Sequence, residues 1–198
     1  LPRICMELGN GKLVIISGPS GSGKSTVVRG LLETCDLPLV VSVSATTREP
    51  RTGERDGFDY HFLSKETFAE RLAAGDFLES KEVFGRGHWY GTLRSEVQAG
   101  LSDGKWVVLE IDVEGALAVL EEVPDCITIF VHTNSLDELE RRLRNRKTDS
   151  EASIRRRLEV AQHELDQRHQ YKHAILNQRV NDTVQKVCET LAQYGENT

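Results

Sequence analysis

The amino-acid sequence predicts an α/β fold in which helices flank a parallel β-sheet. The first observation is an apolar, β-branched run, KLVIIS at residues 12–17, which ends at a glycine-rich turn and is followed by a periodic, helix-like segment. The second is that the same order of strand and helix recurs three more times towards the carboxyl end. Repeated βα units are typical of a parallel sheet with helices on both faces.

The individual elements follow from these patterns. Between residues 44 and 92 the sequence becomes turn-rich, with short alternating segments near 58–63 and 77–84, which predicts an inserted β-rich lobe. Residues 141–157 contain eight Lys or Arg and predict a projecting, charged helical arm. Strands are expected at 12–17, 106–111, 126–131 and 173–176, and helices at 25–35, 113–122, 136–146, 154–170 and 183–194.

The chain length of 198 residues favours one domain rather than two. We expect a single domain over residues 1–198 that is made of a core, the inserted lobe and a helical lid. The approximate boundaries are 11–43, 93–140 and 171–198 for the core, 44–92 for the lobe and 141–170 for the lid.

Composition narrows the classes of protein and partner. Hydrophobic content of 38% and charged content of 28% are typical of a soluble globular protein, and no apolar stretch approaches the roughly 18 residues of a membrane helix. Residues 1–11 lack the order of a signal peptide, so export is not expected. The formal net charge of -6 argues against nucleic acid and anionic membranes as general partners.

The cysteines are scattered. Cys5, Cys35, Cys126 and Cys188 form no CxxC pair and have no histidine at metal-ligand spacing. We therefore expect buried or idle thiols in a reducing compartment, with neither a disulfide nor a structural metal.

A phosphate-binding loop is the most specific motif. Residues 18–25 read GPSGSGKS, which matches GxxxxGK[ST] after a strand and at the start of a helix, and this context argues against a chance glycine-serine turn. The motif predicts a P-loop NTPase core in which backbone N–H groups and the helix N-terminus bind phosphate. Lys24 is expected to reach the β- and γ-phosphates and Ser25 to ligate Mg²⁺. The expected ATP-binding residues of the loop are Gly18, Pro19, Ser20, Gly21, Ser22, Gly23, Lys24, Ser25 and Thr26.

Two acidic residues lie at the end of the strand expected at 106–111. Asp112 is either a second Mg²⁺ ligand or the N-cap of the helix that starts at residue 113, and the sequence does not choose between the two. Glu110 lies inside the strand, where a carboxylate needs a polar partner.

From the phosphate loop onward, essentially the whole chain resembles the guanylate kinases. The segment from Ser44 to Tyr60, the FLE run ending at Glu79, WYGT ending at Thr92, and LEID ending at Asp112 occur in the order of that family. The resemblance implies transfer of the γ-phosphoryl group of ATP to GMP with Mg²⁺, a cytoplasmic location, and nucleotides as the only partners. It leaves a monomer and a homodimer equally open.

The resemblance also implies roles for individual residues. The residues expected to bind GMP are Arg48, Arg51, Tyr60 and Tyr90 at its phosphate, Ser44, Glu79 and Thr92 at guanine, Glu110 and Asp112 on the acceptor and metal side, and Arg157 of the lid. Guanine has two adjacent donors, N1–H and N2–H₂, which one carboxylate can accept, whereas adenine has no proton on N1. Glu79 is therefore the expected specificity residue.

The basic arm has both a functional and a structural interpretation. Its arginines match the lid arginines of the family, which predicts that Arg142 and Arg146, with Asn177 on the adenine side, bind ATP. The alternative is a solvated helix with pairs such as Glu138–Arg142 and Glu151–Arg155. We assign Arg146 and Arg157 to function and Arg144, Arg155 and Arg156 mainly to solvation. The expected catalytic residues are Lys24, Arg48, Arg51, Arg146 and Arg157.

Two other classes of protein remain as alternatives. A non-catalytic, guanylate-kinase-like interaction module shares the fold but has no reason to keep Gly23, Lys24 and Ser25. A P-loop kinase for another acceptor has no reason to keep Ser44 and Glu79 together.

Overall fold

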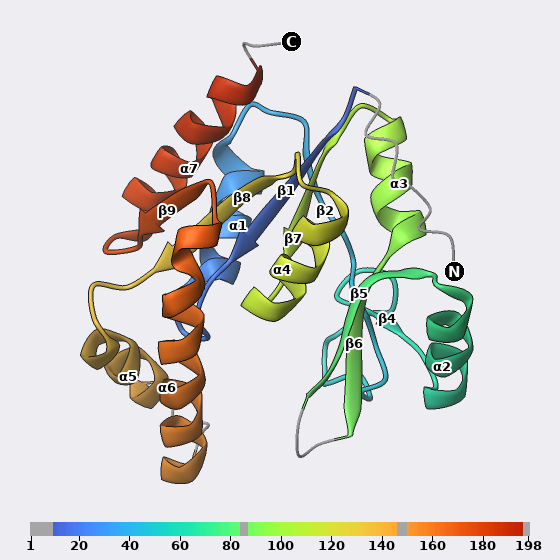
Figure 1. Cartoon of the computed structure of the whole chain (residues 1–198), viewed down its shortest axis with the longest axis horizontal. Helices are drawn as coiled ribbons and strands as arrows, with labels where there is room; N and C mark the ends of the chain where they lie inside the picture. Colours follow the sequence, from blue (N-terminus) through green and yellow to red (C-terminus); the bar gives the residue numbers. More distant parts are fainter. Residues whose placement is uncertain (1–9, 84–86, 146–149, 196–198) are drawn as a thin grey trace. The chain divides into compact units, whose positions relative to one another are not determined.

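The chain forms two compact units. The computed structural model describes residues 10–83, 87–145 and 150–195 (Figure 1). The first unit contains residues 10–13, Val40–Leu109 and Leu117–Cys126. The second contains Val14–Leu39, Glu110–Ala116 and the chain from Ile127 onward.

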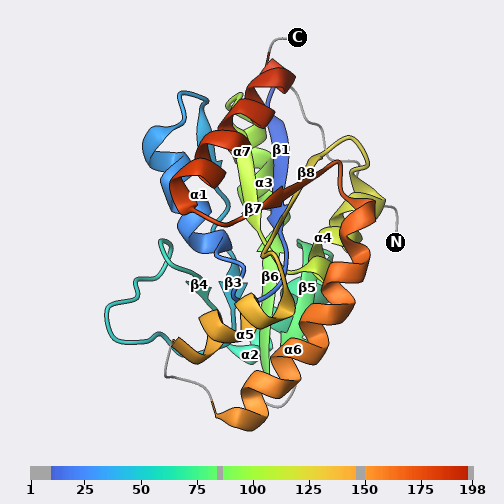
Figure 2. The same ribbon diagram turned by 90° about the vertical axis from the view of Figure 1, so that its left-hand side faces the viewer.

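The second unit carries parallel strands that alternate with helices. Strand β8 pairs in parallel with β1, with Val14 opposite Ile127, and with β9, with Ile129 opposite His173. Helices α5 and α6 lie side by side in both ribbon views (Figures 1 and 2). The elements are β1 (Lys12–Ser17, mostly in this unit), α1 (Lys24–Thr34), β8 (Ile127–His132), α5 (Leu136–Asn145), α6 (Glu151–Asp166), the 3-10 helix Gln167–Gln170, β9 (His173–Leu176) and α7 (Val180–Gly195).

The first unit contains a second, smaller sheet with the strand order β4-β3-β6-β5. Strand β6 pairs antiparallel with both β3 and β5, and the β5–β6 register shifts between Phe77 and Glu79. Phe68 stacks on Phe77 at 4.3 Å between ring centroids, in an apolar cluster beneath this sheet. The elements are β3 (Ala45–Thr46), β4 (His61–Phe62), α2 (Lys65–Ala74), β5 (Phe77–Val83), β6 (His88–Leu93), α3 (Arg94–Ser102), β7 (Trp106–Glu110) and the last part of α4 (Val113–Glu122).

The larger sheet has the strand order β2-β7-β1-β8-β9, with β2 at Leu39–Val41. Its order is not the chain order, which means that crossover connections join the strands. The α/β fold with a parallel central sheet and flanking helices is therefore confirmed. The strands expected at 12–17, 106–111, 126–131 and 173–176 are all present, within one residue at either end.

Two helices and three strands of the structure were not expected from the sequence. They are helices α2 and α3 and strands β2, β3 and β6. Helix α2 buries only Phe68, so its sequence lacks an apolar stripe, and it is instead defined by its ends. The Ser64 hydroxyl accepts from Thr67 N at 3.1 Å, and Gly75 ends the helix at φ 79°. Strand β6 is stabilised by pairing with β5 and β3, which a glycine-rich sequence does not indicate.

A disulfide joins Cys35 and Cys188, so the prediction of idle thiols is wrong for these two residues. They are 153 positions apart in sequence, and their Cα atoms are 5.8 Å apart. They meet because α1 packs against α7, where a Cβ on Gly30 would lie 2.7 Å from a Val184 methyl group. Cys126 is buried and is not disulfide-bonded.

Loss of this disulfide is expected to lower the free energy of unfolding by about 2–4 kcal/mol, because a closed loop restricts the unfolded chain. Urea unfolding with and without a dithiol reductant measures the change. Cys35→Ser is the control, because its unfolding midpoint should not respond to the reductant. An unchanged midpoint in the wild-type protein, after thiol titration has shown that the bond is reduced, would contradict the prediction.

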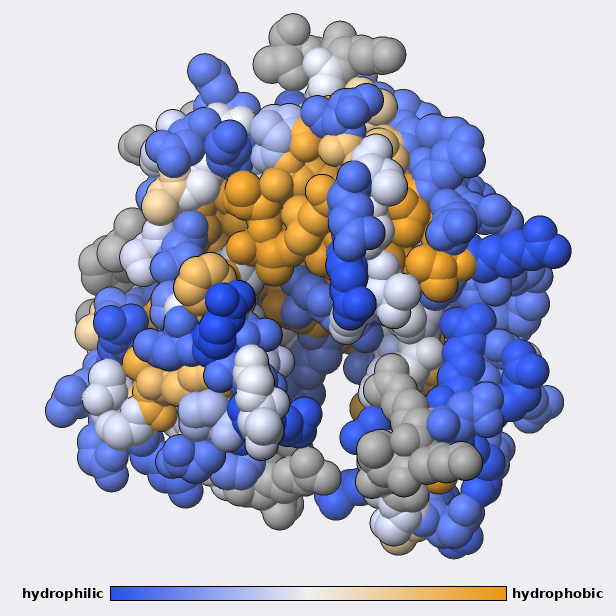
Figure 3. Space-filling view, turned by 180° about the vertical axis from the view of Figure 1, so that it is seen from behind, coloured by the Kyte–Doolittle hydropathy of each residue, from blue (hydrophilic) through white to orange (hydrophobic). Residues whose placement is uncertain are grey.

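Polar residues predominate on one face of the molecule. Hydrophilic residues cover most of the face drawn in Figure 3, and hydrophobic residues gather in a large area of its upper half and a smaller one at the lower left. Among the described residues the exposed large hydrophobic side chains are Leu32, Phe58, Leu72, Val160 and Val180. No helix in the described ranges combines the length and apolarity that crossing a bilayer requires.

Candidate functional site

The loop between β1 and α1 folds as an anion cradle. Gly18, Gly21 and Gly23 have φ values of 138°, 95° and 95°, and residues with a side chain rarely adopt such backbone torsions. At Gly18 there is also no room, because a Cβ would lie 2.1 Å from the carbonyl oxygen of Val131. The glycines therefore let the loop curl tightly and lead into the N-terminus of α1 at Lys24.

Charged and polar side chains line this cradle. The Lys24 ammonium donates to the carbonyl oxygens of Gly18 and of Pro19, the latter at 3.1 Å. The Ser25 hydroxyl donates to Glu110 Oε1 at 2.5 Å, which provides the partner that a carboxylate in this strand needs. The cavity has a volume of about 150 Å³ and is lined by Ser20, Gly21, Gly23, Lys24, Ser25, Thr26 and Glu110.

Asp112 caps a helix. Its Oδ1 accepts a hydrogen bond from Gly115 N at 2.8 Å, and its carbonyl oxygen accepts from Ala116 N at 2.9 Å. The N-cap interpretation of this residue is confirmed. A capping carboxylate has a second oxygen, so the cap does not exclude a metal contact.

The side chains of Arg142 and Asn177 both donate to the backbone of the phosphate loop, at Ser22 O. Arg142 donates to Asn177 O at 2.8 Å and to Ser22 O at 3.4 Å, and Glu138 accepts from its Nε at 2.8 Å. Asn177 is 2% exposed, and its side chain donates to Ser22 O at 2.7 Å and accepts from Thr183 at 2.9 Å. Both residues therefore brace the back of the loop.

The other arginines of the basic arm divide into two groups. Arg157 is half-buried, and its Nη1 donates to the Ser20 hydroxyl of the loop at 3.5 Å. Arg155 and Arg156 are exposed. Arg146 lies outside the described residues.

The expected ion pairs on the arm are partly confirmed. Glu138 pairs with Arg142 as expected. Glu151 pairs with Arg144 instead of Arg155, because α5 and α6 meet at this point. Arg144 also pairs with Glu140 at 2.7 Å, which agrees with a solvating role.

In the first unit, Arg48 is the centre of a polar cluster. Its side chain is 12% exposed and donates to Glu54 Oε1 at 2.9 Å and to the Tyr90 hydroxyl at 3.2 Å. The guanidinium carbon also lies 5.4 Å from the ring centroid of Tyr60, in cation–π geometry. The structure therefore brings Arg48, Tyr60 and Tyr90 together.

Glu54 is a member of this cluster to which the sequence assigned no role. It accepts from Arg48 and, at 2.7 Å, from the backbone N–H of Arg51, and these two hydrogen bonds lower the pKa of its carboxyl group. The Glu54 hydrogen bond also raises the pKa of Arg48. Glu54 follows Arg51 by three residues across a turn, and this spacing could have indicated that the Glu54 carboxylate accepts from the Arg51 backbone. Arg51 itself is exposed.

Glu79 and Thr92 form a second polar pair in the first unit. They lie opposite each other on β5 and β6, and the Thr92 hydroxyl donates to Glu79 Oε1 at 2.6 Å. Thr92 is 1% exposed, whereas Glu79 is half-buried. Ser44 is half-buried and directly precedes β3, and its carbonyl oxygen accepts from His61 N at 2.9 Å.

The predicted residues therefore divide between the two units, and we call the set in each unit a constellation. In the first unit the Arg48 cluster and the Glu79–Thr92 pair are distinct groups within that set. The loop, Glu110, Asp112, Arg142, Arg157 and Asn177 belong to the second unit, and Ser44, Arg48, Arg51, Tyr60, Glu79, Tyr90 and Thr92 belong to the first. The described residues contain no group of three or more His, Cys, Asp and Glu side chains that could hold a metal ion alone.

Known proteins resemble this chain over nearly its full length. The family model described as guanylate kinase matches residues 10–194. A guanylate kinase of Rhodopirellula baltica is 55% identical over 95% of this chain and 90% of the relative, and one of Clostridium perfringens is 46% identical over 89% and 81%. The crystal structure of guanylate kinase from Anaplasma phagocytophilum has a TM-score of 0.73 and 31% identity, covering 93% of this chain and 86% of that one.

Proposed function

Because the chain belongs to the guanylate kinase family, we propose that its two constellations divide one reaction between them. The enzyme transfers the γ-phosphoryl group of ATP to GMP, giving ADP and GDP. A phosphate oxygen of GMP forms the new bond to the γ-phosphorus, and the bond to the bridging oxygen of ADP breaks. The second unit binds the donor, and the first unit binds the acceptor.

The observation that carries the acceptor assignment is the Glu79–Thr92 pair. The Thr92 hydroxyl, 2.6 Å from Glu79 Oε1, fixes the direction of the carboxylate. A fixed carboxylate accepts from guanine N1–H and N2–H₂ together, and the Ser44 hydroxyl serves guanine O6. Adenine has no N1 proton, so its binding leaves a desolvated carboxylate without a partner.

The Arg48 cluster binds the phosphate of GMP. Arg48 and Arg51 supply guanidinium groups, and Tyr60 and Tyr90 supply hydroxyl donors. The Glu54 carboxylate forms an ion pair with Arg48 at 2.9 Å, and this pair orients the guanidinium. A dianionic phosphate competes with this carboxylate for the same donors. Binding of GMP therefore replaces the hydrogen bond from Arg48 to Glu54 with hydrogen bonds from Arg48 to the phosphate.

The cradle between β1 and α1 binds the phosphates of ATP. Backbone N–H groups surround them, and the Lys24 ammonium moves from its two carbonyl partners to the β- and γ-phosphates. Ser25 and Asp112 would hold Mg²⁺, with Glu110 orienting Ser25 through the 2.5 Å hydrogen bond. Hydroxyl and carboxylate oxygens suit this ion, which usually keeps one or two protein ligands beside substrate phosphates. When bound, Mg²⁺ neutralises charge on the phosphate oxygens.

The arm supplies the remaining positive charge. Arg157, already 3.5 Å from Ser20, is placed to neutralise charge on the transferring phosphoryl group, and Arg146 is assigned the same role. Arg142 and Asn177 support the loop from behind, since their polar atoms already bond to Ser22, Thr183 and each other. We propose this bracing role in place of direct contact between Asn177 and adenine.

The acceptor is tested by measuring ADP formation from Mg-ATP with GMP, AMP, UMP and CMP as separate acceptors. Rapid turnover with GMP alone is expected. Binding of GMP without turnover in any divalent metal would favour the interaction module. Rapid turnover with another acceptor would remove the proposed role of Glu79 while leaving the phosphate loop intact.

Other parts of the family resemblance stay predictions. A cytoplasmic location and the absence of nucleic-acid and membrane partners belong here, as does the choice between a monomer and a homodimer. Gel filtration with light scattering measures the assembly directly.

A further inference from the structure

The β5–β6 hairpin carries an irregularity next to the guanine-reading pair. Phe77 lies opposite Leu93, but the next pair is Glu79 opposite Thr92, so β5 uses one more residue than β6 at this point. A bulge of this kind re-aims the side chains that follow it. A slip of one residue would turn the Glu79 carboxylate to the other face of the sheet. Guanine recognition therefore depends on this register.

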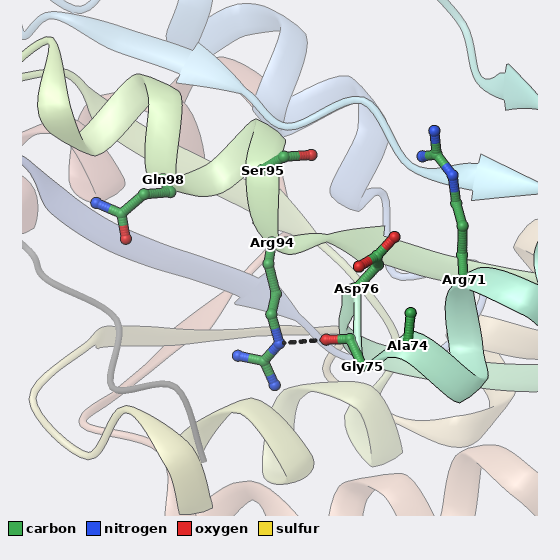
Figure 4. A pocket seen from close by; sticks show the side chains of 7 residues that line it. All are labelled: Arg71, Ala74, Gly75, Asp76, Arg94, Ser95 and Gln98. Atoms are coloured by element: carbon green, nitrogen blue, oxygen red, sulfur yellow. Dashed lines mark hydrogen bonds between the residues drawn. The ribbon is translucent and has the colours of Figure 1, made fainter. Parts of the chain in front are cut away.

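Arg94 fixes the end of the hairpin where the bulge lies. Its backbone N–H donates to Asp76 O at 2.9 Å, and its Nε donates to Gly75 O at 3.0 Å, the contact drawn in Figure 4. Gly75 and Asp76 directly precede β5, and Arg94 directly follows β6. Arg94 thus links the start of β5 to the end of β6, through one main-chain and one side-chain hydrogen bond.

The guanidinium of Arg94 is itself held by a carboxylate. Both terminal nitrogens donate to Glu122 near the end of α4, with Nη2 at 2.7 Å from Oε2. The side chains are 23% and 15% exposed, so water screens this bidentate pair less than it screens surface pairs. Glu122 raises the pKa of Arg94. All these groups belong to the first unit.

We infer that Arg94, anchored by Glu122, is a positioning residue that sets the β5–β6 register and thereby aims Glu79 at the base. The inference rests on the proposed role of Glu79. Gly91 of β6 also packs closely against β5, since a Cβ there would lie 2.9 Å from Glu79 O and 2.7 Å from the Phe77 ring. The contacts of Arg94 and this close packing therefore act on the same part of the register.

Arg94→Gln is expected to raise the Kd for GMP and to lower the GMP-over-AMP ratio of kcat/KM by roughly ten- to a hundredfold, the scale of loss that small misplacements cause. Arg94→Lys keeps a charge for Glu122 but loses the planar fork that bonds Glu122 and Gly75 together, so it should cause a smaller loss than Arg94→Gln. The KM for ATP should stay unchanged, because the phosphate loop lies in the other unit.

Arg71→Gln is the matched control. Arg71 lines the same cavity of about 370 Å³, and its side chain points away from Arg94 (Figure 4). Its carbonyl oxygen accepts from the backbone N–H groups of Gly75 and Asp76, and Arg71→Gln keeps these main-chain contacts. The side-chain bonds to Gly75 O and Glu122 are made by Arg94. The same chemical change there should leave the Kd for GMP and the base preference at wild-type values.

A double-mutant cycle distinguishes positioning from general destabilisation. If Arg94 acts through Glu79, Arg94→Gln should not alter base preference further in a Glu79→Gln background. An equal loss in both backgrounds, or an unchanged base preference in Arg94→Gln, would overturn the inference while leaving the proposed function. An unchanged base preference in Glu79→Gln alone would overturn the proposed role of Glu79 and this inference with it.

Discussion

Replacing Lys24 with alanine is expected to lower kcat for Mg-ATP and GMP by about 10³-fold or more. The Lys24 ammonium is held by Gly18 and Pro19 at the start of α1, beside the cavity in which we place the phosphates. Its removal leaves the charge that develops on the β- and γ-phosphates without its fixed cationic partner. The rate of ADP formation at saturating GMP measures the change.

Lys105→Ala is the control for Lys24→Ala. Lys105 is exposed and precedes β7, so this variant removes one ammonium far along the chain from the loop. Wild-type kcat in Lys105→Ala beside the large loss in Lys24→Ala is the expected result. Retention of more than about a tenth of the activity in Lys24→Ala would show that the loop is not the donor site.

Glu79→Gln is expected to lower the preference for GMP over AMP by about 10²- to 10⁴-fold, which corresponds to two charged hydrogen bonds. The glutamine side chain has the same shape, but one of its two acceptors becomes an N–H₂ donor that faces a guanine donor. It also loses the charge that Thr92 orients. The ratio of kcat/KM for the two acceptors measures the effect.

The control for Glu79→Gln lies on the same strand. Glu82 is exposed on β5, and Glu82→Gln carries the same change in charge and shape. Its base preference should equal that of the wild-type enzyme. If Glu79→Gln and Glu82→Gln have the same preference, another residue reads guanine.

Parts of the fold that depend on local patterns were predictable. The run KLVIIS followed by GPSGSGKS determines a strand, a phosphate loop and a helix within neighbouring residues, and β1 and α1 appear there. The strand at 173–176 was likewise visible as an apolar segment before a helix. Such signals need no knowledge of distant contacts, because side-chain periodicity and glycine torsions act locally.

Elements without an apolar stripe were not predictable by periodicity. Helix α2 depends on a serine cap, a terminal glycine and one buried side chain, Phe68. Strand β6 depends on two partner strands, of which β5 carries a bulge. The information that stabilises these elements lies in contacts with other parts of the chain.

The candidate site also has some features that the sequence indicated and others that only the structure showed. Residue types and motif order indicated Arg48, Glu79, Thr92 and the loop, and each has a chemistry that suits its proposed role. The sequence did not indicate the ion pair between Glu54 and Arg48. It also did not indicate that the Asn177 side chain forms hydrogen bonds with Ser22 and Thr183. It also did not show that Arg94 ties the ends of β5 and β6 to Glu122.

By itself the sequence determined the phosphate loop, the alternation of strands and helices, and the family to which the chain belongs. Only the tertiary structure decided the Cys35–Cys188 pairing, the register that places Glu79 opposite Thr92, and the anchoring of Arg94. The physical reason is the distance along the sequence over which each interaction acts. Backbone torsions and apolar periodicity act over a few residues, whereas a disulfide spanning 153 positions and a bulged register exist only once packing has brought distant segments together.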